Sequence, residues 1–270
     1  VTATPSITTD TNDYLASTGD NTERTNDIAT MLSTYGVCRL GPGVFYVDNL
    51  QMPDNTMLTG AGMQTQIIKS TLIGYTIKLG SYCTVSDVMI EGAPGSTSTP
   101  SADYDHNGIL WYGTYSQDQT APKESMISNV WIHGFSGGGI RCHDTGYGTA
   151  NGLLVTNVYT WNCYAGVYID YWSEFHKFTN VRTNLCYYGC INNGGNNLFV
   201  NCDFSSCQRG FMMNNTNDLA PNNSHGSCIG CVFNHSGSNT NIGIYVINCG
   251  QGFIFSGCQI FYSQNYLKAA

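Results

Sequence analysis

Carboxylic acids stand among aromatic residues near the middle of the chain, a combination that suits the cleavage of sugars. Asp170 and Glu174 lie two residues either side of Trp172, and Asp144 lies one repeat earlier. A glycosidase needs one carboxylic acid to protonate the leaving oxygen and a second carboxylate as base or nucleophile, about 5 Å or roughly 6.5–9.5 Å away according to mechanism. We predict Asp170 as the catalytic carboxylate, with Asp144 or Glu174 as its partner. The same acids could instead be solvated turn residues that bond local backbone amides.

Basic and aromatic residues around these acids could bind the substrate. Arg141 would orient hydroxyl or carboxylate groups, and His143 is a further candidate catalytic residue. Arg141, His143 and Lys177 could also neutralise a uronate carboxylate and abstract a proton, which is lyase chemistry. The aromatic residues that would supply faces for sugar rings are Trp111, Tyr112, Tyr168 and Trp172. The residues leave hydrolase and lyase chemistry both open.

Metal-binding patterns are incomplete. Asp103, Asp105 and Asn107 reproduce the first half of a calcium loop, D-x-D-x-N-G, but the closing glutamate is missing. An Asx-rich turn is the alternative interpretation. Cys228 and Cys231 have CxxC spacing without a second pair of ligands. We predict no metal and no cofactor, with calcium at the first three residues as the alternative.

A repeat of short strands organises the second half of the chain. An Asn recurs every 21 to 28 residues, a Cys or aromatic residue follows six positions later, and a Gly nine or ten positions later precedes another strand. A unit of this size cannot bury its own apolar face, so successive units must stack as a solenoid, here a parallel β-helix. An irregular β-sandwich does not explain the matched offsets. The aligned positions are Asn129, Asn157, Asn180 and Asn201; Phe135, Cys163, Cys186 and Cys207; and Gly139, Gly166, Gly189 and Gly210.

Strand alternation then assigns side chains to the interior or to an exposed ladder. If Ile140 and Val167 point inward, the neighbouring pairs Arg141/His143 and Tyr168/Asp170 point outward. Adjacent strands lie about 4.8 Å apart, which places Asp170 close to His143. The same alternation predicts that Ile191, Asn193, Met212 and Asn214 continue this ladder.

The composition excludes several classes of protein. Ten basic against 18 acidic residues give a net charge of −8, so the positive field that binds nucleic acid is absent. No apolar run approaches the ~20 residues of a membrane span, and the first 20 residues lack the pattern of a signal peptide. For this reason we expect the twelve cysteines to be thiols. Cys163, Cys186 and Cys207 are expected to form an interior column.

The first part of the chain resembles the opening module of pectate-lyase-like right-handed β-helix proteins. The resemblance covers roughly residues 18 to 70, and the acidic signature that usually opens the module is reduced to STGDNTERTND. In that family a short helix caps the solenoid, here expected over Asp27 to Leu32. The matching residues are Leu40, Gly43, Phe45, Tyr46 and Val47 in one strand, and Leu50, Pro53, Asn55, Thr56, Leu58, Gly60 and Gly62 in the coil that follows.

This resemblance implies an all-β fold, a right-handed single-stranded parallel β-helix of roughly eight or more coils with a short N-terminal capping helix. We expect an N-terminal extension over residues 1–26 and the β-helix over 27–270. The final residues, FYSQNYLKAA, do not look like a solenoid cap, which favours further coils beyond them. The family includes pectate lyases, polygalacturonases, epimerases and trimeric phage tailspikes, and the Cys- and Asn-rich body looks most like a prophage tailspike or receptor-binding protein.

The function that this resemblance implies is a spike in a virion tail that binds, and possibly cleaves, a bacterial surface polysaccharide. A non-catalytic structural or adhesive β-helix and a free-standing carbohydrate-active enzyme are the alternatives. A second outward row, Trp131, Tyr159, Trp161 and Arg182, could be a subunit interface, a sugar-stacking surface or ordinary surface. We expect a homotrimer with a cell-surface glycan as partner, and neither nucleic acid nor membrane insertion.

Overall fold

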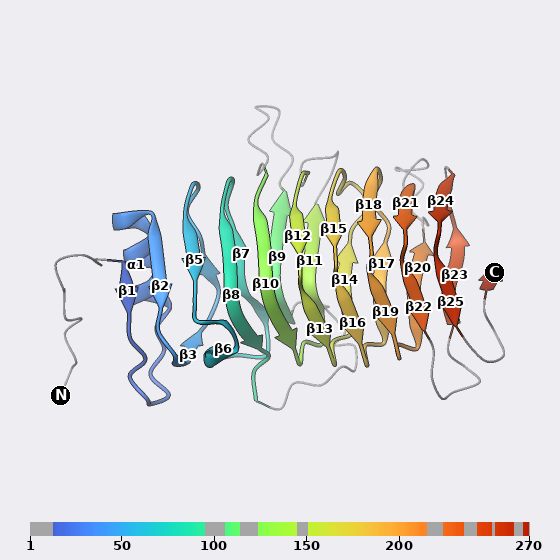
Figure 1. The fold of residues 1–270 in the computed structure, drawn as a ribbon. Coiled ribbons are helices and arrows are strands. Elements are labelled where there is room, and N and C mark those ends of the chain that lie inside the picture. The colour runs from blue at the N-terminus through green and yellow to red at the C-terminus, as the bar shows by residue number, and fades with distance from the viewer. Residues whose placement is uncertain are drawn as a thin grey trace.

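The chain folds as a right-handed parallel β-helix in the computed structural model (Figure 1), which confirms the predicted fold. The structure describes residues 13–94, 106–113, 124–144, 151–214, 224–234, 242–249, 252–261 and 267–269. Within them every strand pairing is parallel, in a 17-stranded sheet A and a nine-stranded sheet B. No helix in these ranges is long and apolar enough to cross a membrane.

Sheet B contributes one strand to each turn of the solenoid. Its strands, in chain order, are β4 (Leu50–Gln51), β7 (Gly74–Leu79), β9 (His106–Gly113), β11 (Gly138–Asp144), β14 (Ala165–Ile169), β17 (Tyr188–Asn192), β20 (Arg209–Asn214), β23 (Ile242–Asn248) and β26 (Leu267–Ala269). Nine strands in the described ranges agree with the predicted eight or more coils.

Sheet A consists of two rows of strands that meet at a bend. The first row is β1 (Tyr14–Leu15), β2 (Val37–Leu40), β5 (Met57–Thr59), β8 (Thr84–Glu91), β10 (Met126–His133), β12 (Leu154–Thr156), β15 (Lys177–Thr179), β18 (Asn197–Val200), β21 (Gly226–Ile229) and β24 (Phe253–Ser256). The second row is β3 (Gly43–Val47), β6 (Thr65–Lys69), β13 (Tyr159–Trp161), β16 (Arg182–Asn184), β19 (Asp203–Ser205), β22 (Val232–Asn234) and β25 (Gln259–Phe261). β8 and β10 run through both rows.

An asparagine ladder forms the bend between the two rows, as the repeat predicts. Asn129, Asn157, Asn180 and Asn201 have left-handed φ values of 55°, 54°, 53° and 51°, a conformation that Asn tolerates better than most residues. The Asn157 amide donates to Asn129 Oδ1 at 3.2 Å, and the Asn180 amide donates to Asn157 Oδ1 at 3.2 Å. Asp87 begins the ladder by accepting from Asn129 at 3.2 Å. Each turn therefore bends in register with the next.

The interior is filled by columns of like side chains. Phe178 stacks on Phe199 with ring centroids 4.9 Å apart, and Phe204 stacks on Phe233 at 5.5 Å. Cys163, Cys186 and Cys207 lie in the interior on successive turns, and none of the twelve cysteines, all of them in the described ranges, forms a disulfide. Burial raises the pKa of the Cys186 thiol well above its ordinary value, which keeps it protonated.

The recurring glycines mark places where neighbouring turns approach too closely for a side chain. A Cβ on Gly189 would lie 2.4 Å from the carbonyl oxygen of Gly210, and one on Gly166 would lie 2.8 Å from that of Gly189. Only glycine fits this column because a real Cβ never comes so close to a backbone oxygen.

The helix α1 (Thr25–Tyr35) covers the first turn and is longer than the predicted Asp27 to Leu32. Ile28 and Leu32 face the core and are fully buried, while Gly36, in the left-handed conformation, ends the helix. A 3₁₀ turn, η1 (Gly62–Gln64), precedes β6. Part of the expected extension, residues 1–26, is joined to the solenoid, since β1 pairs with β2.

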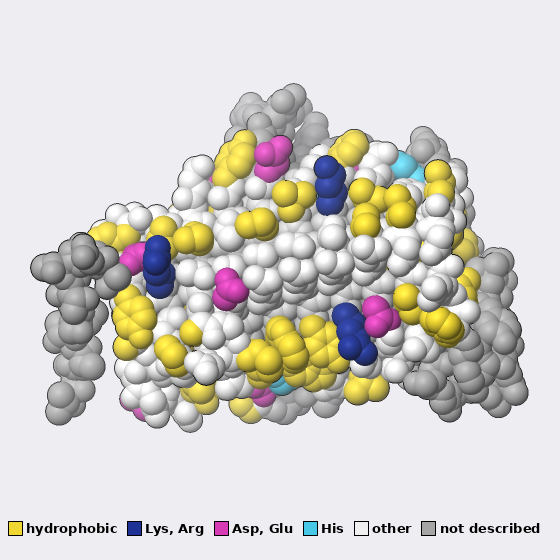
Figure 2. Space-filling view, in the orientation of Figure 1, with side chains coloured by type: hydrophobic (Ala, Val, Ile, Leu, Met, Phe, Trp, Pro, Cys, Tyr) yellow, Lys and Arg dark blue, Asp and Glu magenta, His cyan; other side chains and the backbone are white. Residues whose placement is uncertain are grey.

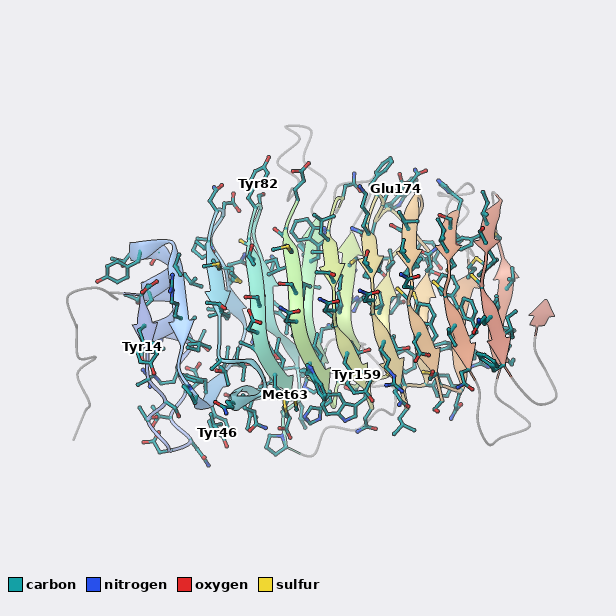
Figure 3. The ribbon with its side chains drawn as sticks, in the orientation of Figure 1. Tyr14, Tyr46, Met63, Tyr82, Tyr159 and Glu174 are labelled. Atoms are coloured by element: carbon teal, nitrogen blue, oxygen red, sulfur yellow. The ribbon has the colours of Figure 1, made fainter. Side chains whose placement is uncertain are left out.

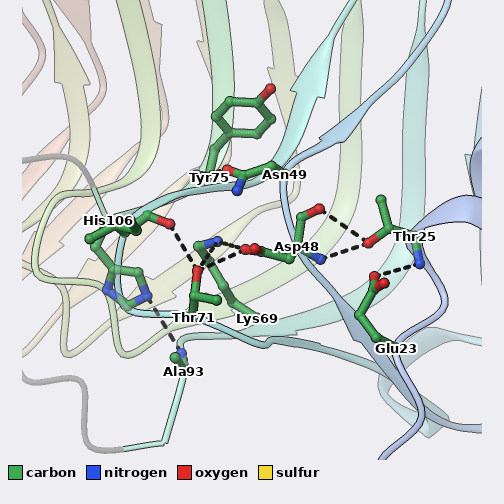
Figure 4. Close-up of polar contacts among 10 residues, drawn as sticks. Glu23, Thr25, Asp48, Asn49, Lys69, Thr71, Tyr75, Ala93 and His106 are labelled. Atoms are coloured by element: carbon green, nitrogen blue, oxygen red, sulfur yellow. Dashed lines mark hydrogen bonds and ion pairs between the residues drawn. The ribbon is translucent and has the colours of Figure 1, made fainter.

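A buried ion pair connects the cap to the first turns (Figure 4). The side chain of Lys69 is fully buried and bonds to Asp48 Oδ1. Thr71 donates to the same oxygen at 2.9 Å, and Thr25 of α1 donates to the Asp48 carbonyl at 3.1 Å. Burial lowers the pKa of Lys69 and the Asp48 carboxylate opposes that shift. The charged lysine therefore depends on Asp48.

Replacing Asp48 by Ala should lower the free energy of unfolding by about 3 kcal/mol, because a buried ammonium group is left without its carboxylate. Urea unfolding followed by circular dichroism measures this loss. Asp13→Ala is the matched control, because its partner Arg39 is 54% exposed and stays hydrated when the carboxylate is removed, so this change should cost under about 1 kcal/mol. Equal losses for the two variants would contradict the role assigned to the buried pair.

The asparagine ladder predicts different costs for two substitutions of Asn157. Asn157→Gly loses the ladder bonds but accepts a left-handed φ, as Gly230 and Gly257 do at the same place in later turns. Asn157→Ala loses the same bonds and also suffers steric strain, so it should be about 1 kcal/mol less stable than Asn157→Gly. Thermal melts of the two proteins test this order, and an alanine variant as stable as the glycine variant would show that the bend is not strained.

Candidate functional site

Five outward side chains on β9, β11 and β14 form a polar and aromatic cluster on sheet B. Arg141 pairs in register with Tyr168, and His143 pairs with Tyr112. Asp170 directly follows β14. We call Tyr112, Arg141, His143, Tyr168 and Asp170 the Asp170 cluster. The structure thus brings together five of the ten residues that the sequence suggested for catalysis or sugar binding.

Asp170 is held by two partners and is only 7% exposed. Its Oδ2 bonds to His143 Nδ1 and lies 3.4 Å from Arg141 Nη2. The Arg141 guanidinium in turn lies over the Tyr168 ring, 5.0 Å from its centroid. A carboxylate can only accept, so His143 donates from Nδ1 and its Nε2 is the acceptor in the neutral ring.

This arrangement gives the three polar residues different chemical capacities. The His143 side chain is 30% exposed and Asp170 only 10%, so His143 is the group that can meet a ligand. Asp170 fixes the orientation of the imidazole ring through its bond to Nδ1. Arg141 contributes positive charge, and Tyr112 and Tyr168 contribute ring faces.

The other two predicted carboxylates do not form a described pair with Asp170. Glu174 lies in the turn between β14 and β15, labelled in Figure 3, where its Oε2 accepts from the Asn196 amide of the next turn at 3.3 Å. Asp144 ends β11 and pairs with Gly113, and its side chain lies outside the described part of the structure. Trp172 is half-buried in the same turn as Glu174, and Lys177 is exposed on sheet A.

The prediction that Trp111 offers a ring to a sugar is wrong. Trp111 pairs with Cys142 and is fully buried in the core. The residue that faces outward on β9 is Tyr112, whose ring lies 4.5 Å from the Lys78 ammonium and 5.2 Å from the His143 ring. Alternation along β9 therefore sends the tyrosine, not the tryptophan, to the surface.

The outward ladder is also not exposed along its whole length. Ile191 and Met212 are 3% and 7% exposed, and Asn193 is 3% exposed. The first two belong to a second apolar cluster outside sheet B. The other members of that cluster are Tyr164 and Ala165, with Tyr168, Tyr187, Tyr188, Tyr245 and Ile247 partly buried against them. The sequence held a signal for these tyrosines, because Tyr164 and Tyr187 each directly follow a cysteine of the repeat.

The metal candidates receive no support from the described residues. Asn107 is buried and its Oδ1 accepts from the Gly138 amide at 2.8 Å, while Asp103 and Asp105 lie outside the described ranges. Cys228 and Cys231 are buried in the core. In the described part of the chain no group of three His, Cys, Asp or Glu residues is placed to hold a metal.

A second outward group lies on the second row of sheet A. We call Trp131, Tyr159, Trp161 and Arg182 the aromatic stripe. Trp131 meets Tyr159 edge-on at 5.2 Å and Arg182 lies 5.6 Å above the Tyr159 ring. His133 stacks on Trp161 at 4.2 Å. Figure 2 shows hydrophobic side chains gathered over this part of the surface, and Figure 3 labels Tyr159 there. Trp131 is 36% exposed.

Comparison with known proteins identifies the fold. No family model and no curated protein matches the chain. The tailspike of the Acinetobacter baumannii bacteriophage Fri1, a capsular polysaccharide depolymerase, aligns with a TM-score of 0.64 and 14% identity over 92% of this chain and 50% of its own. The catalytic domain of a GH87 alpha-1,3-glucanase aligns with a TM-score of 0.61 and 13% identity over 97% and 48%.

The Dettilon tailspike protein aligns with a TM-score of 0.57 and 14% identity, over 87% of this chain and 47% of its own. The chain thus spans about half the length of these three proteins. At such identities the similarity establishes a shared parallel β-helix and nothing about activity. Two of the three are tailspikes and the third is a glucanase, as the sequence resemblance leads one to expect of this architecture.

Proposed function

We propose that the chain binds a polysaccharide along the outer face of sheet B, at the Asp170 cluster. The observation that carries this proposal is the combination of tyrosine rings with Arg141, His143 and Asp170 on one face. Tyrosine rings stack on the apolar faces of sugars, and the charged groups bond to sugar oxygens. Similarity to a capsular polysaccharide depolymerase and to a glucanase in complex with tetrasaccharides supports a glycan as ligand.

Turnover at this site would centre on His143. In this proposal Nε2 exchanges a proton with the bound sugar, while Asp170 acts as a positioning residue that stabilises the imidazolium. This revises the role of Asp170, which the sequence suggested as the acid or nucleophile itself. Asp144 follows His143 at the end of β11 and remains the proposed carboxylate partner, whereas Glu174 bonds to Asn196. Arg141 would neutralise charge on the substrate.

Binding without cleavage is the second candidate function. The Asp170 carboxylate is already bonded to Arg141 and His143. The cluster can therefore bind a sugar without transferring a proton to it. An adhesive β-helix would use the same tyrosines and the same arginine. Both candidate functions include glycan binding, and they differ in whether the bound polysaccharide is cleaved.

We further propose that the protein is a phage tail component that assembles as a parallel homotrimer through the aromatic stripe. The stripe leaves Trp131 exposed beside Tyr159 and Trp161, and exposed aromatic patches are costly on a monomer. Cyclic symmetry would bury the same patch on all three subunits. The two tailspike structures support the phage assignment.

Asp170→Asn should abolish cleavage while leaving binding intact. Loss of the carboxylate should lower turnover about 100-fold or more, since the imidazole loses the group that orients it and stabilises its charge. The measurement is release of reducing ends from a polysaccharide that the wild-type protein binds and degrades. Glu174→Gln is the matched control and should keep activity. Full activity in the Asp170→Asn variant would exclude a catalytic role for the pair, and binding without any released product would favour the adhesin.

The homotrimer is tested by light scattering. The wild-type chain should give the mass of three subunits, and Trp131→Ser should shift the protein toward monomer. Tyr82→Ser is the control, because Tyr82 is 50% exposed and lies on another edge of the solenoid (Figure 3). A monomeric wild-type protein, or an equal effect of the two substitutions, would contradict the proposed interface.

A further inference from the structure

A second arginine on the outer face of sheet B is enclosed by tyrosines. Arg209 begins β20, three strands beyond Arg141 on β11. Its guanidinium lies 5.3 Å from the ring centroids of both Tyr187 and Tyr188, and 5.0 Å from that of Tyr245. Nη1 also donates to the Tyr187 hydroxyl at 2.9 Å and to the Tyr188 hydroxyl at 3.1 Å. We call these four residues the Arg209 box.

Arg209 differs from every other arginine in its charge environment. Each of the remaining four forms an ion pair with an aspartate: Arg24 with Asp27, Arg39 with Asp13, Arg141 with Asp170 and Arg182 with Asp203. Among the described residues Arg209 has no carboxylate partner, although the chain carries a net charge of −8. An uncompensated cation is therefore positioned on the face that we propose as the glycan site.

The surroundings of Arg209 leave its hydrogen-bonding capacity partly unused. Both described bonds leave from Nη1, and Nε is buried with no partner. The Tyr187 hydroxyl accepts from Nη1, so it still has a proton to donate. Positive charge and hydrogen-bond donors thus converge at Arg209. Among the described residues no carboxylate pairs with this charge.

We propose that the Arg209 box binds a negatively charged substituent, a carboxylate or a phosphate, of the polysaccharide that lies along sheet B. This inference rests on the proposed glycan-binding function and specifies the substrate as anionic. A guanidinium recognises carboxylate and phosphate through charge-assisted bonds, while a neutral sugar would leave its charge uncompensated. Three strand spacings of about 4.8 Å separate β11 from β20, roughly 14 Å, a distance that a short oligosaccharide spans.

The test uses an array of purified bacterial polysaccharides, anionic and neutral, probed with the full chain. The wild-type protein should bind an anionic polymer. Arg209→Gln should bind the same polymer at least about tenfold more weakly, because a charge-assisted contact is lost. Arg39→Gln, which removes an exposed arginine from β2 of sheet A, is the matched control and should bind like the wild type.

Chemical modification of the bound polymer identifies the charged group. Reduction of its carboxylates to alcohols, or removal of its phosphates, should weaken wild-type binding by a similar factor and should hardly affect the Arg209→Gln protein. The treatment that has this effect tells carboxylate from phosphate. Tyr187→Phe keeps the ring, removes one donor and should weaken binding several-fold, which provides a test if Arg209→Gln fails to fold.

The outcomes separate this inference from the proposed function. A neutral polymer as the bound ligand, or undiminished binding by Arg209→Gln or by a folded Tyr187→Phe, would overturn the anion site. If the anion site is overturned but Arg141→Gln still loses binding, the glycan site on sheet B remains supported without an anion site at Arg209. If the wild-type protein binds no polysaccharide on the array, both the proposed function and the anion site fall.

Discussion

Stacking between turns is the interaction on which this structure depends. A single turn has two or three short strands and no partner for its apolar side chains, so its interior residues are buried only by the turns on either side. The parallel pairing of β14, β17 and β20 shows the consequence, since Val167, Cys190 and Phe211 follow one another in register inside the solenoid. Anything that shifted one turn by a residue would send its apolar side chains to the surface.

The asparagine ladder and the glycine column protect this register at two different points. The ladder fixes the bend of sheet A by bonds between equivalent side chains. The glycine column lets the backbone of one turn approach the next where sheet B begins. At the N-terminal end the stack instead meets α1, and the buried Lys69 and Asp48 connect that helix to the strands. Together these features hold outward side chains, such as those of the Asp170 cluster, on rigid backbone.

The repeat in the sequence predicted the fold and part of the site for a physical reason. Offsets between Asn, Cys and Gly specify which residues are equivalent, and alternation then places Asp170 beside His143. Trp111 was misassigned because β9 lies before the repeat becomes regular, so its register against β11 could not be aligned from the sequence. Glu174 lies in a turn, where alternation says nothing about direction. Ile191 and Met212 do face outward, but neighbouring tyrosines cover them, and the sequence pattern gives direction without giving exposure.

Because cysteines form columns in the interior, the turns must stack before any of these thiols is oxidised. Strands about 4.8 Å apart bring equivalent Cα atoms within the range that a disulfide spans, so Cys163, Cys186 and Cys207 are neighbours that could be crosslinked. Once the turns have stacked, all three thiols are buried, and the raised pKa values of Cys186 and Cys207 keep those two protonated. Buried thiols are inert toward oxidants. Before stacking they are accessible, and a disulfide between the wrong turns would trap a misaligned solenoid. The native stack thus shields its own thiols, while the unfolded chain depends on its surroundings to keep them reduced.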